Sequence, residues 1–290
     1  MFRVQTQRRY QMSTVYLCAI NNVLSGACNE DCAFCTQSIK HHADIERHNY
    51  KQIEQIVSEA KVAKSFGAFG YCLVTSGKGL DDKKTEFIAK VARAIKQDIS
   101  DIHLIGCNGI ADQDQLRYLK KNGIDSYNHN LETSPWYYEK ICTTHSWDER
   151  YQTCENVKLA GLALCSGGIF GMEEDAEDRD ELIRAIASLE PNSVPINFFI
   201  SNKALPIKSS NLAQDEALSI IKETRKTLGK ESIIMIAGGR ELMFGGNERE
   251  MFGAGANAIV IGDYLTTKGE DALKDIQMIK DLGFKIGIKC

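Results

Sequence analysis

Short apolar runs alternate with longer amphipathic stretches along most of the chain. The runs are rich in Val, Ile and Leu and show little polar–apolar alternation, which is typical of parallel strands buried on both faces. They predict eight strands, at residues 16–21, 68–75, 102–108, 125–131, 163–168, 193–200, 233–237 and 258–262.

The amphipathic stretches carry apolar residues at spacings of three and four. They predict helices at residues 52–65, 85–96, 112–122, 148–160, 178–189 and 214–228. Asp112 and Asp178 are predicted N-caps, because a short acidic side chain can accept from the free N–H groups of a first turn. Glycine readily adopts the left-handed conformation that ends a helix. It precedes several strands, at Gly67, Gly123, Gly161 and Gly253.

Repetition of the strand–helix unit predicts an α/β fold with a parallel sheet. Eight units in 290 residues fit a single (β/α)8 TIM barrel, and a doubly wound sheet is the alternative. With only four prolines and no linker-like tract, residues 16–290 are expected to form one domain. Residues 1–15 are expected to be disordered or loosely ordered. Met12 is an alternative start, so whether residues 1–11 belong to the native protein stays open.

The composition narrows the range of functions. A net charge of −4 with interspersed signs gives no reason to expect binding to nucleic acid or anionic lipid. No apolar run reaches the roughly 18 residues of a membrane helix and no signal peptide is recognisable, so we expect a cytoplasmic protein. Disulfides are rare in the cytosol, and metal binding or catalysis is therefore expected for several of the ten cysteines.

Three of these cysteines follow the first predicted strand. Cys28, Cys32 and Cys35 are separated by three and two residues, with Phe34 before the last. Thiolates suit iron–sulfur clusters, and three of them can hold a cubane cluster whose fourth iron stays open to a non-protein ligand. A structural zinc site completed by a nearby histidine is the alternative. The spacing resembles the signature of the radical S-adenosylmethionine (SAM) superfamily.

Further segments follow in order along the chain. They are DSYNHNLETS (125–134), LCSGGIFG (164–171), SVPIN (193–197), AGGRE (237–241), AGANAI (254–259) and LTTK (265–268). Together with SGACNEDCAFCTQS (25–38), they closely resemble the biotin synthase family, from about Tyr16 to the end of the chain.

The resemblance implies a homodimeric radical SAM barrel that converts dethiobiotin to biotin, the last step of biotin biosynthesis. It implies a [4Fe-4S] cluster on Cys28, Cys32 and Cys35 that binds and cleaves SAM. It also implies an auxiliary iron–sulfur cluster that donates the sulfur, and an electron donor such as flavodoxin or ferredoxin.

By position, the resemblance assigns the auxiliary cluster to Cys72, Cys107 and Cys165, in or at the end of three predicted strands. From spacing alone, buried core cysteines are the alternative. Two residues depart from the family: Met235 stands where many members have an arginine ligand, and Leu24 where a lysine is common. The auxiliary cluster is therefore expected to be a [2Fe-2S] cluster with another fourth ligand, or a larger cluster.

Polar residues of the fourth predicted strand complete the expected site. Alternation puts Asn128, Asn130 and Glu132 on one face and His129 on the other. The resemblance implies contacts of Asn128, Asn130 and Asn197 with dethiobiotin. It implies contacts with SAM for Asn130, Glu132, Arg150, Gly167 and Gly168. The alternatives are internal hydrogen bonds, a surface salt bridge of the arginine and a simple Gly-Gly turn.

Two other functions stay open on the sequence. A radical SAM lyase or mutase for amino acids would use one cluster, and a zinc-binding or regulatory module would use none. Hydrogen abstraction by a carbon radical needs no general base, so no side chain is predicted to act in acid–base catalysis. This prediction includes His41, His42, His103 and His145.

Overall fold

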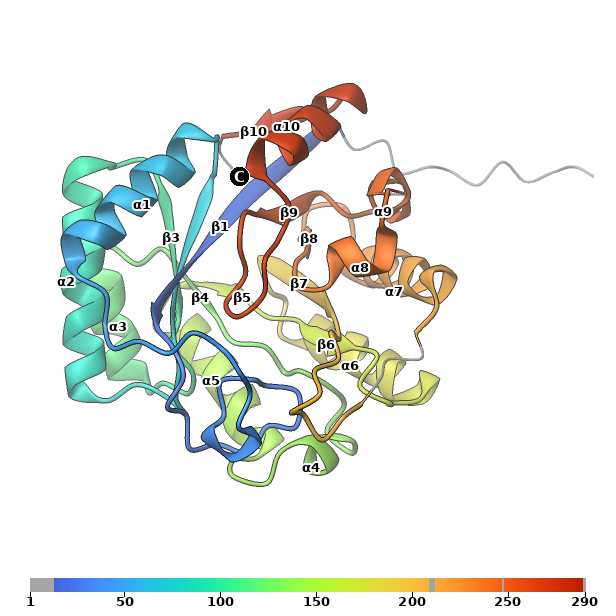
Figure 1. Cartoon of the computed structure of the whole chain (residues 1–290), viewed down its shortest axis with the longest axis horizontal. Helices are drawn as coiled ribbons and strands as arrows, with labels where there is room; N and C mark the ends of the chain where they lie inside the picture. Colours follow the sequence, from blue (N-terminus) through green and yellow to red (C-terminus); the bar gives the residue numbers. More distant parts are fainter. Residues whose placement is uncertain (1–12, 209–211, 247, 289–290) are drawn as a thin grey trace, which may run out of the picture.

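The computed structural model describes residues 13–208, 212–246 and 248–288. Eight parallel strands form a closed barrel, because β1 (Thr14–Leu24) pairs with both β2 (Gly70–Thr75) and β9 (Ala258–Ile261). This closure confirms the TIM barrel and rules out the doubly wound sheet (Figure 1). The other barrel strands, in order, are β3 (His103–Cys107), β4 (Ser126–Asn128), β5 (Ala163–Cys165), β7 (Ser193–Phe198) and β8 (Ile233–Ile236).

Two further strands lie outside this ring. β6 (Gly168–Phe170) pairs with β7, and β10 (Lys285–Gly287) pairs with the start of β1. Because Thr14 is already paired with Lys285, β1 begins two residues before the predicted strand, and residues 14–15 are not loosely ordered. Residues 1–12 of the predicted loose segment lie outside the described residues.

Two strands end three residues before their predicted ends. The run 163–168 is divided between β5 and β6 at Gly167, where a Cβ would lie 1.9 Å from the carbonyl oxygen of Pro195. The run 125–131 ends as a strand at Asn128. Beyond it the backbone bonds instead to the link between β5 and β6, with Leu131 N donating to Gly167 O at 2.9 Å.

All six predicted helices are present. They are α1 (Ile53–Ser65), α2 (Asp82–Asp98), α3 (Gln113–Lys121), α5 (Trp147–Leu159), α6 (Ala176–Ser188) and α7 (Gln214–Leu228). Five further helices were not predicted: the 3-10 helix η1 (Ile39–His41), α4 (Tyr138–Ile141), α8 (Arg240–Phe244), α9 (Glu248–Ala254) and α10 (Ala272–Asp281).

The helix ends confirm some predictions and correct others. Asp112 caps α3 as predicted, but α6 begins earlier than expected, and its N-cap is Asp175. Asp178 is the third residue of that helix and completes the capping box. Gly253 lies inside α9, and the positive φ of 122° belongs to Gly255 instead.

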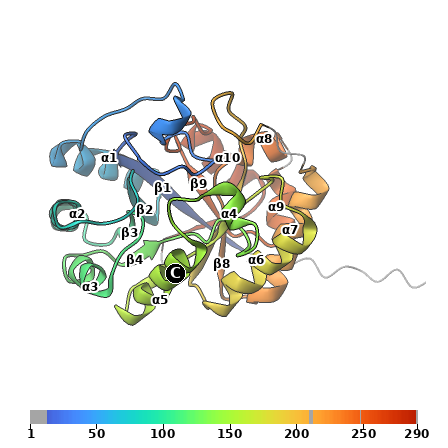
Figure 2. The same cartoon turned by 90° about the horizontal axis from the view of Figure 1, so that it is seen from below.

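The helices surround the barrel, as the view from below shows (Figure 2). The main core lies between the two layers, where Ile56 of α1, Ile88 of α2 and Leu104 of β3 are fully buried. Burying such side chains is the main stabilising contribution to a fold of this kind. Among the described helices, none combines the length and the apolar character that crossing a bilayer would require.

A buried ion pair joins the last helices to the barrel. Arg240 Nη2 of α8 lies 2.9 Å from Asp275 Oδ2 of α10, and both side chains are almost fully buried. We expect Arg240→Met to lower the free energy of unfolding by about 3–5 kcal/mol, because the substitution leaves a buried carboxylate without its partner. Urea denaturation measures the loss. The double variant Arg240→Met/Asp275→Leu should recover most of the lost free energy of unfolding. If the single and the double variant are equally destabilised, the loss comes from packing and not from the unpaired carboxylate.

Candidate functional site

A cavity of about 400 Å³ opens where the C-terminal ends of the barrel strands meet the loop after β1. This is the end of a TIM barrel at which binding sites form. Most of the residues singled out in the sequence contribute to its wall. They are Cys28, Cys32, Cys35, Cys72, Cys107, Cys165, Asn128, Asn130, Glu132, Arg150, Asn197 and Met235.

The cysteine triplet lies on a loop that folds back on itself. Ile39 N donates to Cys28 O at 2.9 Å, and Cys35 N donates to Cys32 O at 3.0 Å. Gly26 enters this loop with a φ of 74°, which glycine adopts without strain. The backbone therefore brings all three thiols to the mouth of one cavity.

The surroundings of Cys32 and Cys35 make these two thiols hard to ionise without a cation. Burial raises the pKa of Cys35 to about 11. A hydrogen bond with Cys142, together with burial, raises the pKa of Cys32. Buried sulfur ligands of this kind release their protons when a metal supplies the compensating charge, so the chemistry of the triplet suits a metal cluster.

Deeper in the barrel lies a second group of thiols. Cys72 of β2, Cys107 at the end of β3 and Cys165 at the end of β5 all face the cavity. The strand register places Cys107 beside Val74 and Cys165 beside Asn128. A hydrogen bond with Cys107 and burial raise the pKa of Cys72, and burial raises that of Cys165 to about 12.

A fourth thiol faces the same space. Cys18 of β1 is buried, and it packs with Cys72 and Met235. Burial, aided by the nearby Cys165, raises its pKa to about 12. Cys18 was not predicted to belong to this group, because its position opposite Gly70 of β2 follows only from the strand register. Met235 is a buried packing residue of the barrel interior.

The polar residues after β4 reach the cavity without continuing the strand. The prediction that Asn130 and Glu132 belong to β4 is wrong, because the strand ends at Asn128. Glu132 adopts a φ of 71°, in the left-handed region, and forms a single bridge with Gly168. His129 also contributes to the cavity wall, so simple alternation does not describe this segment.

Hydrogen bonds fix two of these side chains. Arg150 Nη2 donates to Glu132 Oε1 at 2.9 Å, and Arg150 Nε donates to Asn130 O at 2.6 Å. Both partners of the ion pair are about nine-tenths buried, so the surface salt bridge considered above is wrong. Asn130 Oδ1 accepts from Gly167 N at 3.2 Å.

Several buried polar atoms at the cavity have no partner among the described residues. Glu132 Oε2, Asn128 Oδ1 and His129 Nε2 are such atoms. Asn128 Nδ2 lies 3.3 Å from Cys107 Sγ of the second thiol group. Unpaired buried polar atoms cost free energy, so their gathering here indicates a bound polar ligand.

Asn197 and the two glycines make a different contribution. Asn197 Nδ2 donates to Gly168 O at 3.1 Å, and its Oδ1 accepts from Gly238 N at 2.9 Å. A Cβ on Gly167 or Gly168 would clash with Pro195 O or with Leu182 and the Glu132 backbone. In the structure these three residues hold strand ends together, and Asn197 also contributes to the cavity wall.

Comparison with known proteins agrees with this geometry. Residues 22–186 match the family model of the Radical SAM superfamily, and residues 195–285 match that of the Biotin and Thiamin Synthesis associated domain. A biotin synthase of a Sulfurovum species is 60% identical over 276 residues, which cover 95% of this chain and 97% of the relative. The chain belongs to the biotin synthase family.

Other members and more distant folds complete the comparison. The biotin synthase of a Nitratiruptor species is 59% identical over 95% of this chain and 99% of its own length. Methylornithine synthase (PylB) shares the fold, with a TM-score of 0.78 at 19% identity over 94% of this chain and 84% of its own. The FeFe-hydrogenase maturase HydG from Carboxydothermus hydrogenoformans has a TM-score of 0.82 at 15% identity, covering 96% and 68%.

Membership in the biotin synthase family relates the two thiol groups to iron–sulfur clusters. Radical SAM enzymes carry a [4Fe-4S] cluster and bind SAM, and the triplet at the mouth of the barrel has the thiols for such a cluster. The second group adds more thiols than one cubane needs. The unpaired oxygen atoms of Asn128 and Glu132 lie at the same cavity.

Proposed function

We propose that the chain inserts sulfur into dethiobiotin to form biotin, the last step of biotin biosynthesis. Membership in the biotin synthase family supports this activity. The observation that carries it is the presence of two thiol groups at one cavity, Cys28, Cys32 and Cys35 at the mouth and Cys72, Cys107 and Cys165 inside. An enzyme that only makes a radical from SAM needs the first group alone.

The triplet would hold the [4Fe-4S] cluster and leave one iron for the amino and carboxylate groups of SAM. With electrons from a low-potential donor, this cluster would supply the reductive cleavage of SAM to methionine and a 5′-deoxyadenosyl radical, one for each of the two C–H bonds of dethiobiotin that must break, and the auxiliary cluster would supply the sulfur. The chain itself binds and orients the two substrates, and no side chain needs to act as a general base.

The polar residues around the cavity would position both substrates. Glu132 Oε2 is free to accept from ribose hydroxyl groups of SAM, while Arg150 holds the other carboxylate oxygen. Asn128 Oδ1 is free to accept from an N–H of the cyclic urea of dethiobiotin. Asn130, Asn197, Gly167 and Gly168 would shape the cavity around the ligands through the hydrogen bonds and close backbone contacts described above.

Cys72, Cys107 and Cys165 would hold the auxiliary cluster, with the fourth ligand supplied by another residue. Cys18 is the better candidate, because a thiolate is a strong iron ligand and a thioether such as Met235 is a weak one. Both side chains pack in the same cluster of buried residues as Cys72. With Cys18 as the fourth ligand, the auxiliary cluster can also be larger than [2Fe-2S].

The affinity for SAM is expected to depend on pH through Glu132. Burial raises the pKa of this carboxyl group despite the nearby Arg150. A protonated carboxyl is a poorer acceptor, so binding should weaken as the pH falls through the raised pKa and stay constant above it. Glu132→Gln should bind SAM about tenfold more weakly and lose this dependence. Calorimetric titration of the cluster-loaded protein with SAM across pH measures both effects, and an unchanged pH slope in the variant would exclude Glu132 as the cause.

The cellular setting follows from the proposed reaction. An electron donor such as flavodoxin or ferredoxin, a homodimeric assembly and a cytoplasmic location are proposed with it. A radical SAM lyase or mutase is the second candidate function, and it would need about four irons per chain rather than more.

The decisive experiment is turnover under oxygen-free conditions. The reconstituted chain receives SAM, dethiobiotin and reduced flavodoxin, and biotin and 5′-deoxyadenosine are quantified by mass spectrometry. We expect both products, with iron and sulfide counts clearly above about four per chain. Formation of 5′-deoxyadenosine without biotin, at about four irons per chain, would favour the second candidate. Zinc without iron in a metal-complete preparation would contradict both.

A further inference from the structure

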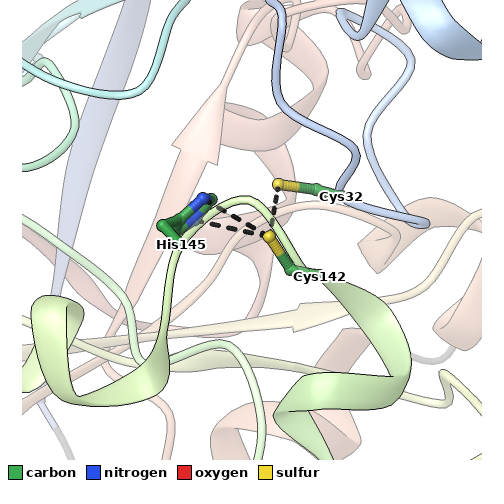
Figure 3. Close-up of side chains that lie close together, drawn as sticks. All are labelled: Cys32, Cys142 and His145. Atoms are coloured by element: carbon green, nitrogen blue, oxygen red, sulfur yellow. Dashed lines mark hydrogen bonds between the residues drawn. The ribbon is translucent and has the colours of Figure 1, made fainter.

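A second set of metal-ligating side chains meets beside the triplet. Cys142 follows α4, and His145 precedes α5, yet both lie against Cys32 from the loop after β1 (Figure 3). The sulfur and imidazole atoms of these three residues lie within 4.8 Å of one another. Cys142 and His145 are buried, and neither has a part in the proposed reaction.

The distances in this group match the edges of a metal-centred tetrahedron. Cys32 Sγ lies 3.7 Å from Cys142 Sγ, and Cys142 Sγ lies 3.8 Å from His145 Nε2. With Zn–S bonds of about 2.3 Å and Zn–N bonds of about 2.0 Å, tetrahedral ligand atoms are about 3.5–3.8 Å apart. Cys142 Sγ also lies 3.4 Å from His145 Nδ1, so the imidazole has to turn for Nε2 to point at a divalent ion between these atoms, while the backbone can stay in place.

The surroundings orient the ligands in the way that metal sites require. Glu30 Oε2 lies 2.7 Å from His145 Nδ1, so this nitrogen carries the proton and Nε2 presents its lone pair. Asp31 Oδ1 lies 3.4 Å from Cys142 Sγ and accepts from Thr143 N at 2.9 Å. Two carboxylates and two thiols thus surround one position, where the carboxylate charge favours a cation and the cation would release the protons of the thiols.

One contact competes with the ion. Arg150 Nη1 lies 3.2 Å from His145 Nε2 and donates to the lone pair that a metal would use. Arg150 has other partners, Asn130 O and Glu132 Oε1, so it can release His145 and keep its position. The ion would gain two thiolate bonds and one imidazole bond in exchange for a single hydrogen bond.

We propose that the cluster-free chain binds one Zn²⁺ ion through Cys32, Cys142 and His145, with Asp31 or water in the fourth position. Cys32 also belongs to the cluster of the proposed function, so the two occupancies exclude each other. Zinc at this site holds the chain in a form that cannot assemble the [4Fe-4S] cluster until the ion leaves. Only this exclusion rests on the proposed function.

Titration with Co²⁺ tests the site, because tetrahedral Co²⁺–thiolate centres absorb visible light and Co²⁺ replaces Zn²⁺ with the same geometry. The full-length, metal-free, oxygen-free chain is titrated and its absorption recorded. We expect Cys142→Ser and His145→Gln each to lose about one tetrahedral Co²⁺ per chain. The matched controls Cys154→Ser and Cys28→Ser should keep it.

Two results would overturn the proposal. One is equal Co²⁺ absorption in the wild type and in Cys142→Ser. The other is an equal loss in Cys28→Ser and Cys142→Ser, which would place the ion on the triplet.

A second measurement tests the exclusion. Chains preloaded with Zn²⁺ receive iron and sulfide, and iron incorporation is followed over time. We expect slow incorporation in the wild type and fast incorporation in Cys142→Ser, which also shows that this variant folds. If iron incorporation were equally slow in the wild type and in Cys142→Ser, zinc at this site would not be what blocks cluster assembly. If neither chain ever took up a cluster, the proposed function would fail while the Co²⁺ result stood.

Discussion

Replacing Cys32 by alanine is expected to abolish both the [4Fe-4S] cluster and the cleavage of SAM. Two remaining thiols cannot hold a cubane with one open iron, so the low-potential electron has no path to the sulfonium group. The formation of 5′-deoxyadenosine should fall by at least about 10³-fold. Mass spectrometry of the nucleoside and iron analysis of the same oxygen-free sample provide the two readouts. Cys28→Ala and Cys35→Ala should behave in the same way.

Cys154 offers a matched control for this prediction. It is fully buried in α5 and donates to His129 O, so Cys154→Ser keeps the hydrogen bond and changes no residue of the triplet. We expect normal iron content and normal SAM cleavage in this variant. Substantial SAM cleavage by Cys32→Ala would show that the radical arises without the triplet and would refute the proposed function.

Replacing Cys107 by alanine is expected to separate the two halves of the reaction. The triplet lies on a different loop, so 5′-deoxyadenosine formation should stay within about tenfold of the wild type, while biotin formation falls by at least about 10³-fold. The physical reason is that the sulfur donor loses one of its ligands. Cys107 also accepts from Asn128, so part of any loss in dethiobiotin affinity belongs to that contact.

Mössbauer spectroscopy of Cys107→Ala and Cys18→Ser completes this test. Cys107→Ala should retain only the signal of the [4Fe-4S] cluster. Cys18→Ser should change the auxiliary signal and leave the other intact, whereas Met235→Leu should change neither. An unaltered auxiliary signal in Cys18→Ser would exclude Cys18 as the fourth ligand. Full biotin formation by Cys107→Ala would remove this cysteine from the sulfur donor.

The barrel could be predicted from sequence because its signals are local. Each strand is a Val/Ile/Leu-rich run, and helices such as α7 (Gln214–Leu228) repeat apolar residues with the helical period. The two short helices after β8, α8 and α9, were missed because a segment of five or seven residues spans too few turns to establish a period. The link between β5 and β6 was missed because its cause, the approach of Pro195, lies on another strand.

For the candidate site too, local motifs could be predicted from the sequence, and contacts between distant segments could not. The triplet is a local motif and was readable from spacing alone. The position of Asn130 and Glu132 was predicted by strand alternation, but the backbone turns after Asn128 to pair with a distant segment. Cys142 and His145 meet Cys32 across more than a hundred residues, and no spacing rule links positions that only the closed barrel brings together.

The backbone at Glu132 has a consequence for any attempt to engineer heat resistance. A residue with a side chain in the left-handed region costs on the order of 1 kcal/mol or more, and glycine at that position would relieve it. This relief is smaller than the accompanying loss, because Glu132→Gly would also leave the buried Arg150 guanidinium without the carboxylate that it pairs with, at a cost of about 3–5 kcal/mol. Selection for melting temperature alone would therefore keep Glu132 in its strained conformation, so at this position stability and the placement of a carboxylate for the ribose favour the same residue.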